Sequence, residues 1–403
     1  MLTATVLAVV VGIGFRVAEF SRNRPLWRDE ASLLSNVVGR PVFELGVPLF
    51  HEQMAPPIFL VATRAWVRLA GESSYAIRFP SLLCGIAGLF ALWGVARRYV
   101  SEAAVPVALA FVAVSDVLIY FATEFKQYSN DLLILLGCLW LGAEMGAREW
   151  TSRRVAVVGG LGVLATWVSH TAVFGLAAVA AVAALDALLR RDGRRFATAV
   201  GLGSLWAVSF AGCFVVSDAM ISPESRDFLW RWWWFAFLPL PPRSLDEART
   251  VSWQLVNVFT NPVGLASPLG PLWAALVALA LFCAGLAVLV ARGWRQALIL
   301  LIPVGLTLAA SALGRYPFHG RVIMFLVPCL VLPVAEGVTL VGRRFGRTAL
   351  IVLVAFFLIA PTSDLLLFRR TRPFDSHGDP RHDLLDYLEE RAKLLGVRPA
   401  PAE

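Results

Sequence analysis

Charge is scarce in this 403-residue chain, because only 16% of its residues are charged while 58% are hydrophobic. Water-soluble domains carry roughly a quarter charged residues. Apolar runs recur here from residue 2 to residue 363 without a long soluble stretch. The composition therefore excludes a soluble globular protein. It predicts one polytopic membrane domain over residues 1–363, followed by a short extracytoplasmic tail at 364–403.

Lysine is nearly absent, since the chain holds only Lys126 and Lys393, and the formal net charge of +8 rests on arginine. In a membrane protein such an excess concentrates in cytoplasmic loops, so we expect membrane lipids and no nucleic acid as partners. The five cysteines stand singly in apolar segments, at spacings that suit neither a metal site nor a redox pair. We interpret them as small packing residues.

Eleven apolar runs are long enough to cross a membrane. The first, residues 2–15, spans only about 21 Å at 1.5 Å per residue, short of the roughly 30 Å of hydrocarbon. It must therefore include a snorkelling Arg16 and extend to about Phe20. It lacks the basic region and cleavage site of a signal peptide, so we keep it as a helix. The later runs are 79–96, 103–122, 131–147, 155–169, 171–189, 196–217, 271–291, 296–313, 322–341 and 348–363.

Arginine pairs and blocks fall on alternate connections between these runs, which places all of them inside if the N-terminus is inside. The outer segments are then 21–78, 121–130, 169–171, 218–270, 314–321 and the tail from about 364. Segment 55–71 must not cross, because a crossing would invert every later loop. Two prolines open it, and Arg64 and Arg68 stand four residues apart on one helical face. This pattern predicts an interfacial helix that lies on the membrane.

Acids and bases meet at the predicted outer face. The stretch PLWRDEASLL contains Asp29 and Glu30, directly after Arg28. In YFATEFKQYSND, a helix that begins near Glu124 would align Glu124, Tyr128 and Asp131 on one stripe, beside Lys126. Polar groups at membrane depth are costly, so a functional site is the default interpretation. The same face also receives Ser169, His170, Arg315, Tyr316, His319 and Arg321.

Each of these groups has a plainer alternative. Asp29 and Glu30 would serve as the cap and first turn of a short helix, ASLLSNVV. Glu124 and Lys126 would form a structural ion pair, and His170 would be an interfacial junction residue. His51 and Gln53 would be solvated, and Arg315 and Arg321 would bind lipid headgroups. The tryptophans of FLWRWWWFAFLPLPP suit an interfacial belt or a platform for a lipid or sugar; they are Trp230, Trp232, Trp233 and Trp234.

Several motifs in order over about residues 26 to 330 carry a family resemblance. They are WRDEASL, HEQMAPPIFL followed by GESSYAIRFPSLL, EFKQYSND, SHTAVF, WWFAFLPLPP and YPFHGRVIMFLVP. The chain resembles the bacterial membrane glycosyltransferases of the GT-C fold. It is similar to protein mannosyltransferases of the glycosyltransferase family 39 type, aminoarabinose transferases and Rgt-type lipopolysaccharide sugar transferases.

The resemblance implies an all-α integral membrane fold with about eleven transmembrane helices and an outer cavity. It also implies two juxtamembrane helices in the first outer loop, which residues 30–38 and 56–70 fit. The donor would be a polyprenyl-phosphate sugar, and the sequence agrees in having no glycine-rich phosphate loop. Related proteins often carry a further outer domain, whereas about forty residues, with a predicted helix at 380–395, follow the last span here.

A lipid-phosphate donor already has a good leaving group, so the chemistry needs a base on the acceptor hydroxyl and cations on the departing phosphate. The acceptor would be an envelope lipid, glycan or protein at the outer face of the bacterial inner membrane. A single displacement predicts inversion at the anomeric carbon. We assign Asp29 as the base beside Arg28, with Glu30 orienting the acceptor or a divalent ion. Lys126 and Arg321 would hold the phosphate, Glu124 and Tyr128 would position Lys126 and the sugar, and His170 and Tyr316 would line the cavity.

Two other classes of protein stay open. A polyprenyl-lipid flippase would carry charged groups at mid-membrane and internal repeats, whereas the charges here lie at one face and no repeat is evident. A scaffold subunit would use its acids only as helix caps. Geometry discriminates among them, because a transferase needs Asp29, Glu124, Lys126 and Arg321 to converge.

Overall fold

The structure is a computed structural model that describes residues 1–39, 48–51, 53–147 and 149–367. Every regular element in these ranges is helical. The predicted tail helix at 380–395 lies outside the described residues. The helices are α1 (Leu2–Ser21), α2 (Arg28–Gly39), α3 (Pro57–Ala70), α4 (Ser74–Tyr99), α5 (Ala104–Val114), α6 (Asp116–Phe121), α7 (Tyr128–Ala147), α8 (Ser152–Val168), α9 (Ala172–Leu189), α10 (Gly193–Ala219), α11 (Pro223–Trp233), η2 (Trp234–Ala236), α12 (Leu245–Asn257), α13 (Pro271–Arg292), α14 (Trp294–Ala312), η3 (Gly320–Leu326), α15 (Val327–Phe345) and α16 (Arg347–Leu366).

All eleven predicted runs are helical, and the prediction of an all-α membrane protein is confirmed. Within the described ranges, eight spans are long and apolar enough to cross a membrane: α1, α4, α9, α10, α13, α14, η3 with α15, and α16. The run 103–122 is not one helix, because it breaks at Ser115 into α5 and α6. The Ser115 hydroxyl accepts a hydrogen bond from the Leu118 N–H at 3.3 Å and caps α6.

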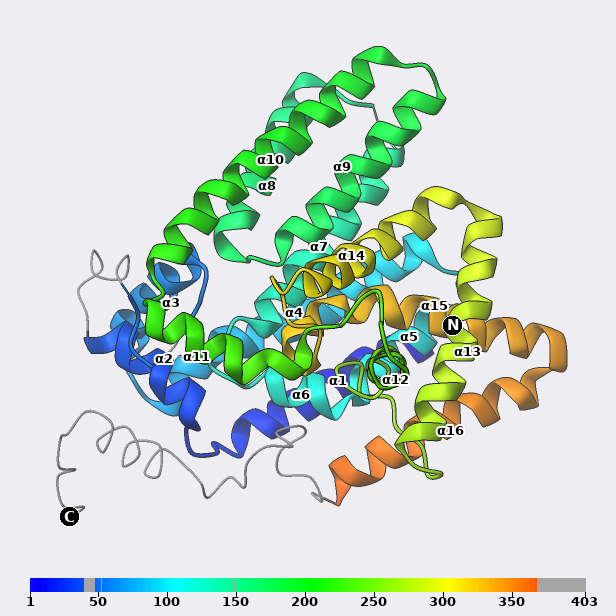
Figure 1. The fold of residues 1–403 in the computed structure, drawn as a ribbon. Coiled ribbons are helices and arrows are strands. Elements are labelled where there is room, and N and C mark those ends of the chain that lie inside the picture. The colour runs from blue at the N-terminus through cyan, green and yellow to red at the C-terminus, as the bar shows by residue number, and fades with distance from the viewer. Residues whose placement is uncertain (40–47, 52, 148, 368–403) are drawn as a thin grey trace.

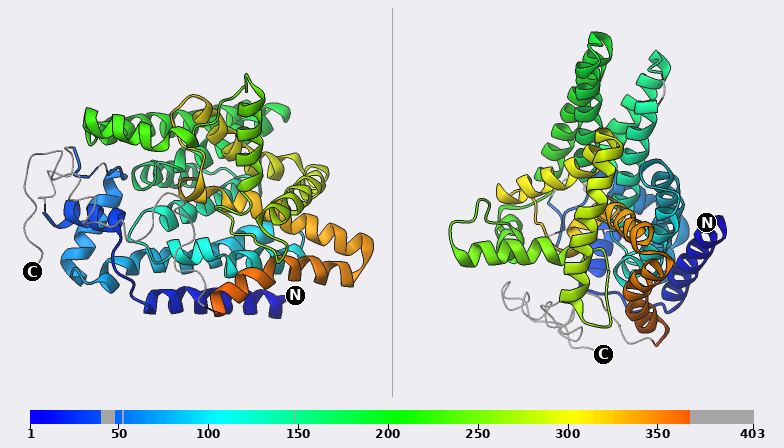
Figure 2. Two further views of the ribbon diagram at one scale, coloured as in Figure 1. Left: turned by 60° about the horizontal axis from the view of Figure 1, so that its bottom comes forward. Right: turned by 90° about the vertical axis from the view of Figure 1, so that its right-hand side faces the viewer.

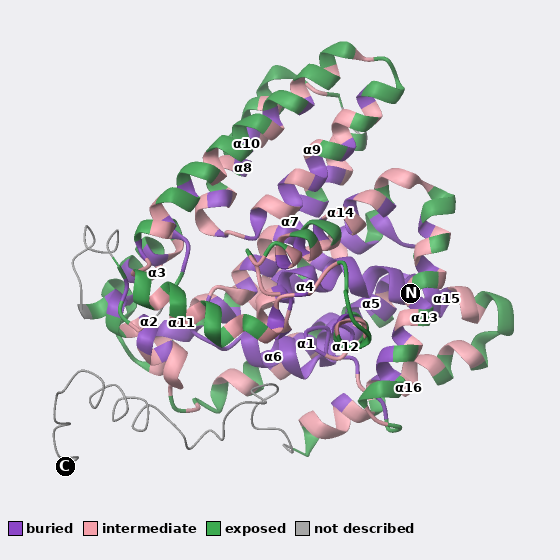
Figure 3. Ribbon diagram, in the orientation of Figure 1, coloured by how far each residue is buried: buried purple, intermediate pink, exposed green. Residues whose placement is uncertain are grey.

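The core of the molecule surrounds η3 and α15, in which 94% of an 18-residue apolar window is buried (Figure 3). α13 packs against α15 at very short range. An added Cβ at Gly285 would lie 1.9 Å from the Pro333 carbonyl oxygen, and one at Gly337 would lie 2.0 Å from the Leu281 carbonyl oxygen. Glycine at both positions therefore lets the two backbones touch, as is common between membrane helices.

Arg16 corrects the prediction for the first helix. α1 extends to Ser21, as its required length predicts, but Arg16 does not snorkel toward the membrane surface. Its side chain is buried, and its guanidinium donates to the Gly12 carbonyl at 3.0 Å and to the Val112 carbonyl at 3.3 Å. A buried guanidinium needs such acceptors, so Arg16 connects α1 to α5.

The helical bundle has two unlike ends (Figures 1 and 2). α2, α3 and α11 gather at one end, and the connections α9–α10, α13–α14 and α15–α16 lie at the other. Ion pairs join helix ends at the second, including Arg98–Glu144 at 2.9 Å and Arg295–Asp186 at 2.5 Å. We call it the arginine-rich end; it carries Arg98, Arg190, Arg195, Arg292, Arg295 and Arg343.

The first long loop contains the two helices that the resemblance predicts, α2 and α3. The expectation that Arg64 and Arg68 both face the membrane surface is wrong, however. Arg68 is exposed, whereas Arg64 is buried and donates a hydrogen bond to the Val37 carbonyl at the end of α2. Arg64 therefore fastens α3 to α2 instead of facing a membrane surface.

Candidate active site

The acid pair lies in the first turn of α2, and its two carboxylates point to different partners. The Asp29 Oδ2 atom lies 2.8 Å from the Arg321 Nη2 atom at the start of η3, although 292 residues separate the two. Glu30 is fully buried and pairs with Arg78 of α4. A helix N-terminus favours both anions, so their local position is alike and only the tertiary contacts separate them.

Glu30 is saturated with donors. Its carboxylate accepts from Arg78 Nε at 2.7 Å and Nη2 at 2.5 Å, from the Phe125 N–H at 2.8 Å and from the Trp27 N–H at 3.3 Å. The last contact is the acidic half of a capping box, so the plainer alternative describes Glu30. Orientation of an acceptor or an ion by Glu30 does not fit this arrangement, because the donors already occupy both oxygens. Glu30 instead joins α2, α4 and the turn before α7.

That turn, residues 122–127, carries the second acid. α7 begins at Tyr128 and not near Glu124, so the predicted stripe through Glu124, Tyr128 and Asp131 is wrong. Glu124 is fully buried, and neither of its carboxylate oxygens has a hydrogen-bond partner. Burial raises the pKa of Glu124 to about 8, and the neighbouring carboxylates of Glu30 and Asp29 add to the rise, while Arg321 opposes it.

Lys126 is also buried, but its contact differs from the expected ion pair with Glu124. Its Nζ donates to the Gln53 Oε1 atom, and the Gln53 Nε2 atom donates to the His51 carbonyl at 2.8 Å. Gln53, expected to be solvated, is in fact buried. Burial lowers the pKa of Lys126, as does Arg321, while the carboxylate of Asp29 opposes this.

Aromatic rings enclose Arg321. Its guanidinium carbon lies 4.9 Å from the Trp27 ring, 5.9 Å from the Tyr128 ring and 5.9 Å from the Trp233 ring. Aromatic faces attract a cation at this range. Since Arg321 is also one of the least exposed arginines at this end, with 14% of its side chain accessible, its charge is held where water is scarce.

The tryptophans of the long loop therefore divide into two pairs. Trp230 and Trp234 are 59% and 67% exposed, as an interfacial belt would be. Trp233 faces Arg321, and the Trp232 ring lies 5.7 Å from the Arg28 guanidinium carbon. The exposed pair fits the predicted interfacial belt, whereas Trp232 and Trp233 lie against arginines.

Four charged side chains converge at this end; we call them the charged cluster and define it as Asp29, Glu124, Lys126 and Arg321. Burial alone would raise the pKa of Asp29, but the charges of Arg321, Lys126 and Arg28 outweigh it and hold that pKa below its usual value. Asp29 is thus an ionised carboxylate at neutral pH, while Glu124 keeps its proton. These two neighbouring carboxyl groups therefore have opposite protonation states, which is a common feature of catalytic sites.

Two predicted site residues are engaged elsewhere. His170 shares a hydrogen bond with the Ser217 hydroxyl of α10 at 2.8 Å, and burial lowers its pKa to about 4, so it is neutral. Tyr316 donates its hydroxyl to the Val322 carbonyl at 2.8 Å, and its ring packs against Phe174. Arg315 is exposed. Only Arg321 of that loop reaches the charged cluster.

Sequence reasoning missed several supporting residues. Arg24 lies 4.0 Å above the Tyr120 ring and donates to the Thr123 hydroxyl at 2.7 Å, which holds the turn that carries Glu124 and Lys126. Arg78 occurs inside the motif GESSYAIRFPSLL, which was the available signal. The charge pattern offered no signal that would have pointed to Gln53 or Trp27.

A divalent ion does not fit the side chains of this site. In the part of the chain that the structure describes, no group of three or more His, Cys, Asp or Glu side chains could hold a metal. The acids of the charged cluster have Arg321 and Lys126 as neighbours, which would repel a metal cation.

Comparisons with known proteins agree with the motifs. Residues 54–211 match the sequence profile of the dolichyl-phosphate-mannose-protein mannosyltransferase family. Among curated protein sequences, none matches the chain.

Solved structures resemble the whole chain. An oligosaccharyltransferase from Archaeoglobus fulgidus, in a complex with zinc and sulfate, has a TM-score of 0.59 at 11% identity over 99% of this chain and 57% of its own. The AglB oligosaccharyltransferase of that organism, bound to an inhibitory peptide and a dolichol-phosphate, has a TM-score of 0.59 at 10% identity. The match covers 100% of this chain and 60% of its own. ArnT from Cupriavidus metallidurans, bound to undecaprenyl phosphate, has a TM-score of 0.54 at 17% identity. The match covers 92% of this chain and 66% of its own. The chain thus spans less than two thirds of the length of each of these proteins.

Proposed function

We propose that this chain, a polytopic membrane protein with the GT-C fold as its motifs predict, is a glycosyltransferase that moves a sugar from a polyprenyl-phosphate donor to an acceptor hydroxyl. The observation that carries the proposal is the pairing of an ionised carboxylate with buried cations, at 2.8 Å for Asp29 and Arg321. The matched family and two structural neighbours have names or bound ligands that contain a polyprenyl phosphate, either dolichol or undecaprenyl.

The net charge of the cluster suits such a donor. With Asp29 ionised and Glu124 protonated, Arg321 offsets Asp29, and the four groups sum to +1 while Lys126, whose pKa burial lowers, keeps its proton. A lipid-linked sugar phosphate is a diester with a single negative charge. When the bond to the sugar breaks, the phosphate becomes a monoester and gains charge, so fixed cations in a water-poor site stabilise the transition state more than the bound donor.

Binding of the donor would also loosen the contact between Asp29 and Arg321, so that Asp29 can act as the base. In the resting site Arg321 neutralises Asp29, and its enclosure by Trp27, Tyr128 and Trp233 limits the directions in which its guanidinium can turn. A donor phosphate that accepts a hydrogen bond from Arg321 weakens the ion pair between Arg321 and Asp29. Asp29 can then accept a hydrogen bond from the acceptor hydroxyl, and the protonated Glu124 can donate one to a phosphate oxygen.

The transfer is a single displacement. The acceptor oxygen forms a bond to the anomeric carbon while the bond from that carbon to the phosphate oxygen breaks, and its electron pair stays on the departing polyprenyl phosphate. The acceptor proton passes to Asp29. One displacement inverts the anomeric centre, so a product with retained configuration would exclude this scheme.

We place the site at the outer face of a bacterial inner membrane. The support is the separation of charges in the fold, because the charged cluster lies at the end opposite the arginine-rich end, which the positive-inside rule assigns to the cytoplasm. In a variant without native cysteines, Asp246→Cys of α12 should react with an impermeant thiol reagent added to intact spheroplasts. Arg194→Cys of α10 should stay protected, and the reverse pattern would overturn the orientation.

The activity itself is tested in proteoliposomes supplied with a panel of radiolabelled polyprenyl-phosphate sugars and an envelope extract as acceptor. We expect one sugar to enter a lipid, glycan or protein product, with loss of label from the donor. Movement of a fluorescent polyprenyl phosphate between leaflets without any transfer would favour a flippase, and neither event would favour a scaffold.

A further inference from the structure

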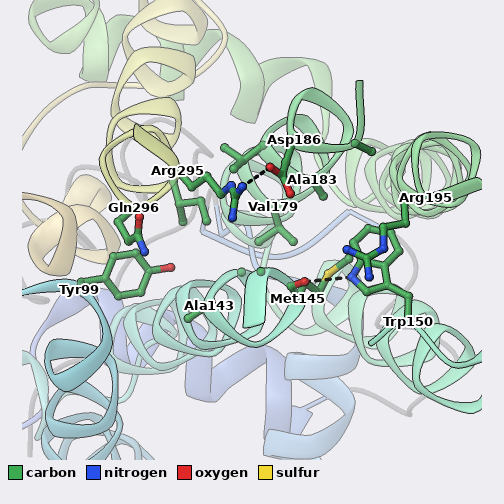
Figure 4. Close-up of a pocket in the computed structure, with 15 residues that line it drawn as sticks. Tyr99, Ala143, Met145, Trp150, Val179, Ala183, Asp186, Arg195, Arg295 and Gln296 are labelled. Carbon is green, nitrogen blue, oxygen red and sulfur yellow. Dashed lines mark hydrogen bonds and ion pairs between the residues drawn. The ribbon is translucent and has the colours of Figure 1, made fainter. Parts of the chain in front are cut away.

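A cavity lies at the arginine-rich end, remote from the charged cluster. It has a volume of about 160 Å³ and opens between the ends of α7, α9 and α14 (Figure 4). Small and aliphatic side chains form its floor, among them Ala143, Val179, Ala183 and Ile299. The floor would therefore accept an apolar group, and the size admits several water molecules or one small polar headgroup.

The rim of this cavity is cationic. The Asp186 Oδ1 atom lies 2.5 Å from Arg295 Nη2 and 3.0 Å from Arg190 Nε, so two guanidinium groups share one carboxylate oxygen. Arg195 pairs with Asp192 at 3.3 Å and keeps 37% of its side chain exposed. Among the described residues that line the cavity, Arg195 and Arg295 accompany Asp186, which leaves a net charge of +1. Trp150 also lines the cavity, and its Nε1 donates to the Met145 carbonyl at 2.9 Å (Figure 4).

We propose that this cavity binds the headgroup of an anionic phospholipid. The phosphate would contact Arg195 and Arg295 at the mouth, and the glycerol and first acyl carbons would lie on the apolar floor. Basic pockets between membrane helices at the cytoplasmic side suit such headgroups. A membrane lipid fits better than free phosphate because an entirely polar anion would leave the apolar floor without a partner.

Two glycines of α7 provide a matched pair of variants. Gly146 lines the cavity, whereas Gly137 is on the same helix and does not line it. A Cβ added at either position meets no atom within 4 Å, so a side chain at both begins in open space. Gly146→Leu would fill the cavity, while Gly137→Leu makes the same chemical change elsewhere on the helix.

The test is native mass spectrometry of the purified full chain after incubation with dioleoyl phosphatidylglycerol or dioleoyl phosphatidylcholine. We expect selective retention of phosphatidylglycerol, reduced about tenfold in Gly146→Leu and unchanged in Gly137→Leu. Arg195→Gln, at a partly exposed side chain, should also reduce retention and keeps the test valid if Gly146→Leu fails to fold.

Three results would overturn the assignment. Equal retention of the two lipids would remove the charge selectivity, and equal loss in both glycine variants would remove the cavity from the binding. Displacement of the bound phosphatidylglycerol by inorganic phosphate alone would identify a site for the free anion instead. None of these readouts depends on transferase activity.

Discussion

Two buried glutamates, one at each end of the bundle, have opposite surroundings. Glu336 of α15 accepts hydrogen bonds from Arg292 and Arg343, both at 2.9 Å, and from the Ser101 N–H at 2.7 Å. Glu124 accepts none, although both side chains are 0% exposed. A buried carboxylate that is fully satisfied holds helices together, whereas one that lacks donors is costly and is expected where a ligand completes the site.

The same contrast occurs within the acid pair of α2. Glu30 accepts four hydrogen bonds, whereas Asp29 pairs with Arg321, the arginine that we propose contacts the donor phosphate. Adjacent residues of like chemistry therefore divide into a structural role and a proposed catalytic role.

The largest expected effect is on stability, from Glu30→Ala. Removing one partner of a buried ion pair leaves the other charge uncompensated, at a cost of about 3–5 kcal/mol. Unfolding in detergent, followed by circular dichroism against temperature, should show the loss. Arg78→Ala should cost a similar amount, and the double variant should cost less than the sum. Full stability in Glu30→Ala would refute the structural role.

Asp29→Asn should keep the fold and lose the activity. The amide still accepts a hydrogen bond from Arg321 but cannot take a proton, so transfer should fall by about 10² or more. Initial rates in proteoliposomes measure this effect, with Asp246→Asn on α12, whose side chain is 89% exposed, as the matched control. Near-normal turnover in Asp29→Asn would remove Asp29 from the mechanism.

Lys126→Ala should act on the donor. Loss of one phosphate cation should raise the KM for the polyprenyl-phosphate sugar by about tenfold, with a smaller change in the KM for the acceptor. Gln53→Ala should produce a weaker form of the same change, because Gln53 only holds the Lys126 ammonium in place. A larger effect on the acceptor KM in both variants would place Lys126 on the other substrate.

Glu124→Gln should remove a pH dependence of the free energy of unfolding. The folded chain keeps the Glu124 proton up to a pKa of about 8, whereas the unfolded chain loses it near 4.5. Between these values folding takes up a proton, so the stability that Glu124 contributes falls as pH rises. Subtracting the unfolding profiles of wild type and Glu124→Gln isolates this slope. Parallel profiles would mean that Glu124 is ionised in the fold.

Local sequence was sufficient to predict the features that depend on hydropathy or on the charge pattern. The apolar runs located all eleven helical segments, and the arginine pattern separated the two ends of the bundle. The family resemblance predicted α2 and α3, and the charge pattern made Asp29, Lys126 and Arg321 candidates. The break at Ser115 and the start of α7 at Tyr128 were missed, because capping and turn contacts decide where a helix ends.

The sequence by itself determined that the chain is a membrane bundle with acids and bases at one end. Only the tertiary structure decided which acid has its oxygens filled with hydrogen bonds and which one we propose as the base. Asp29 and Glu30 share one helical turn and one charge, so no local pattern distinguishes them. Their partners are 292 and 48 residues away, and contacts over such separations depend on how the helices pack.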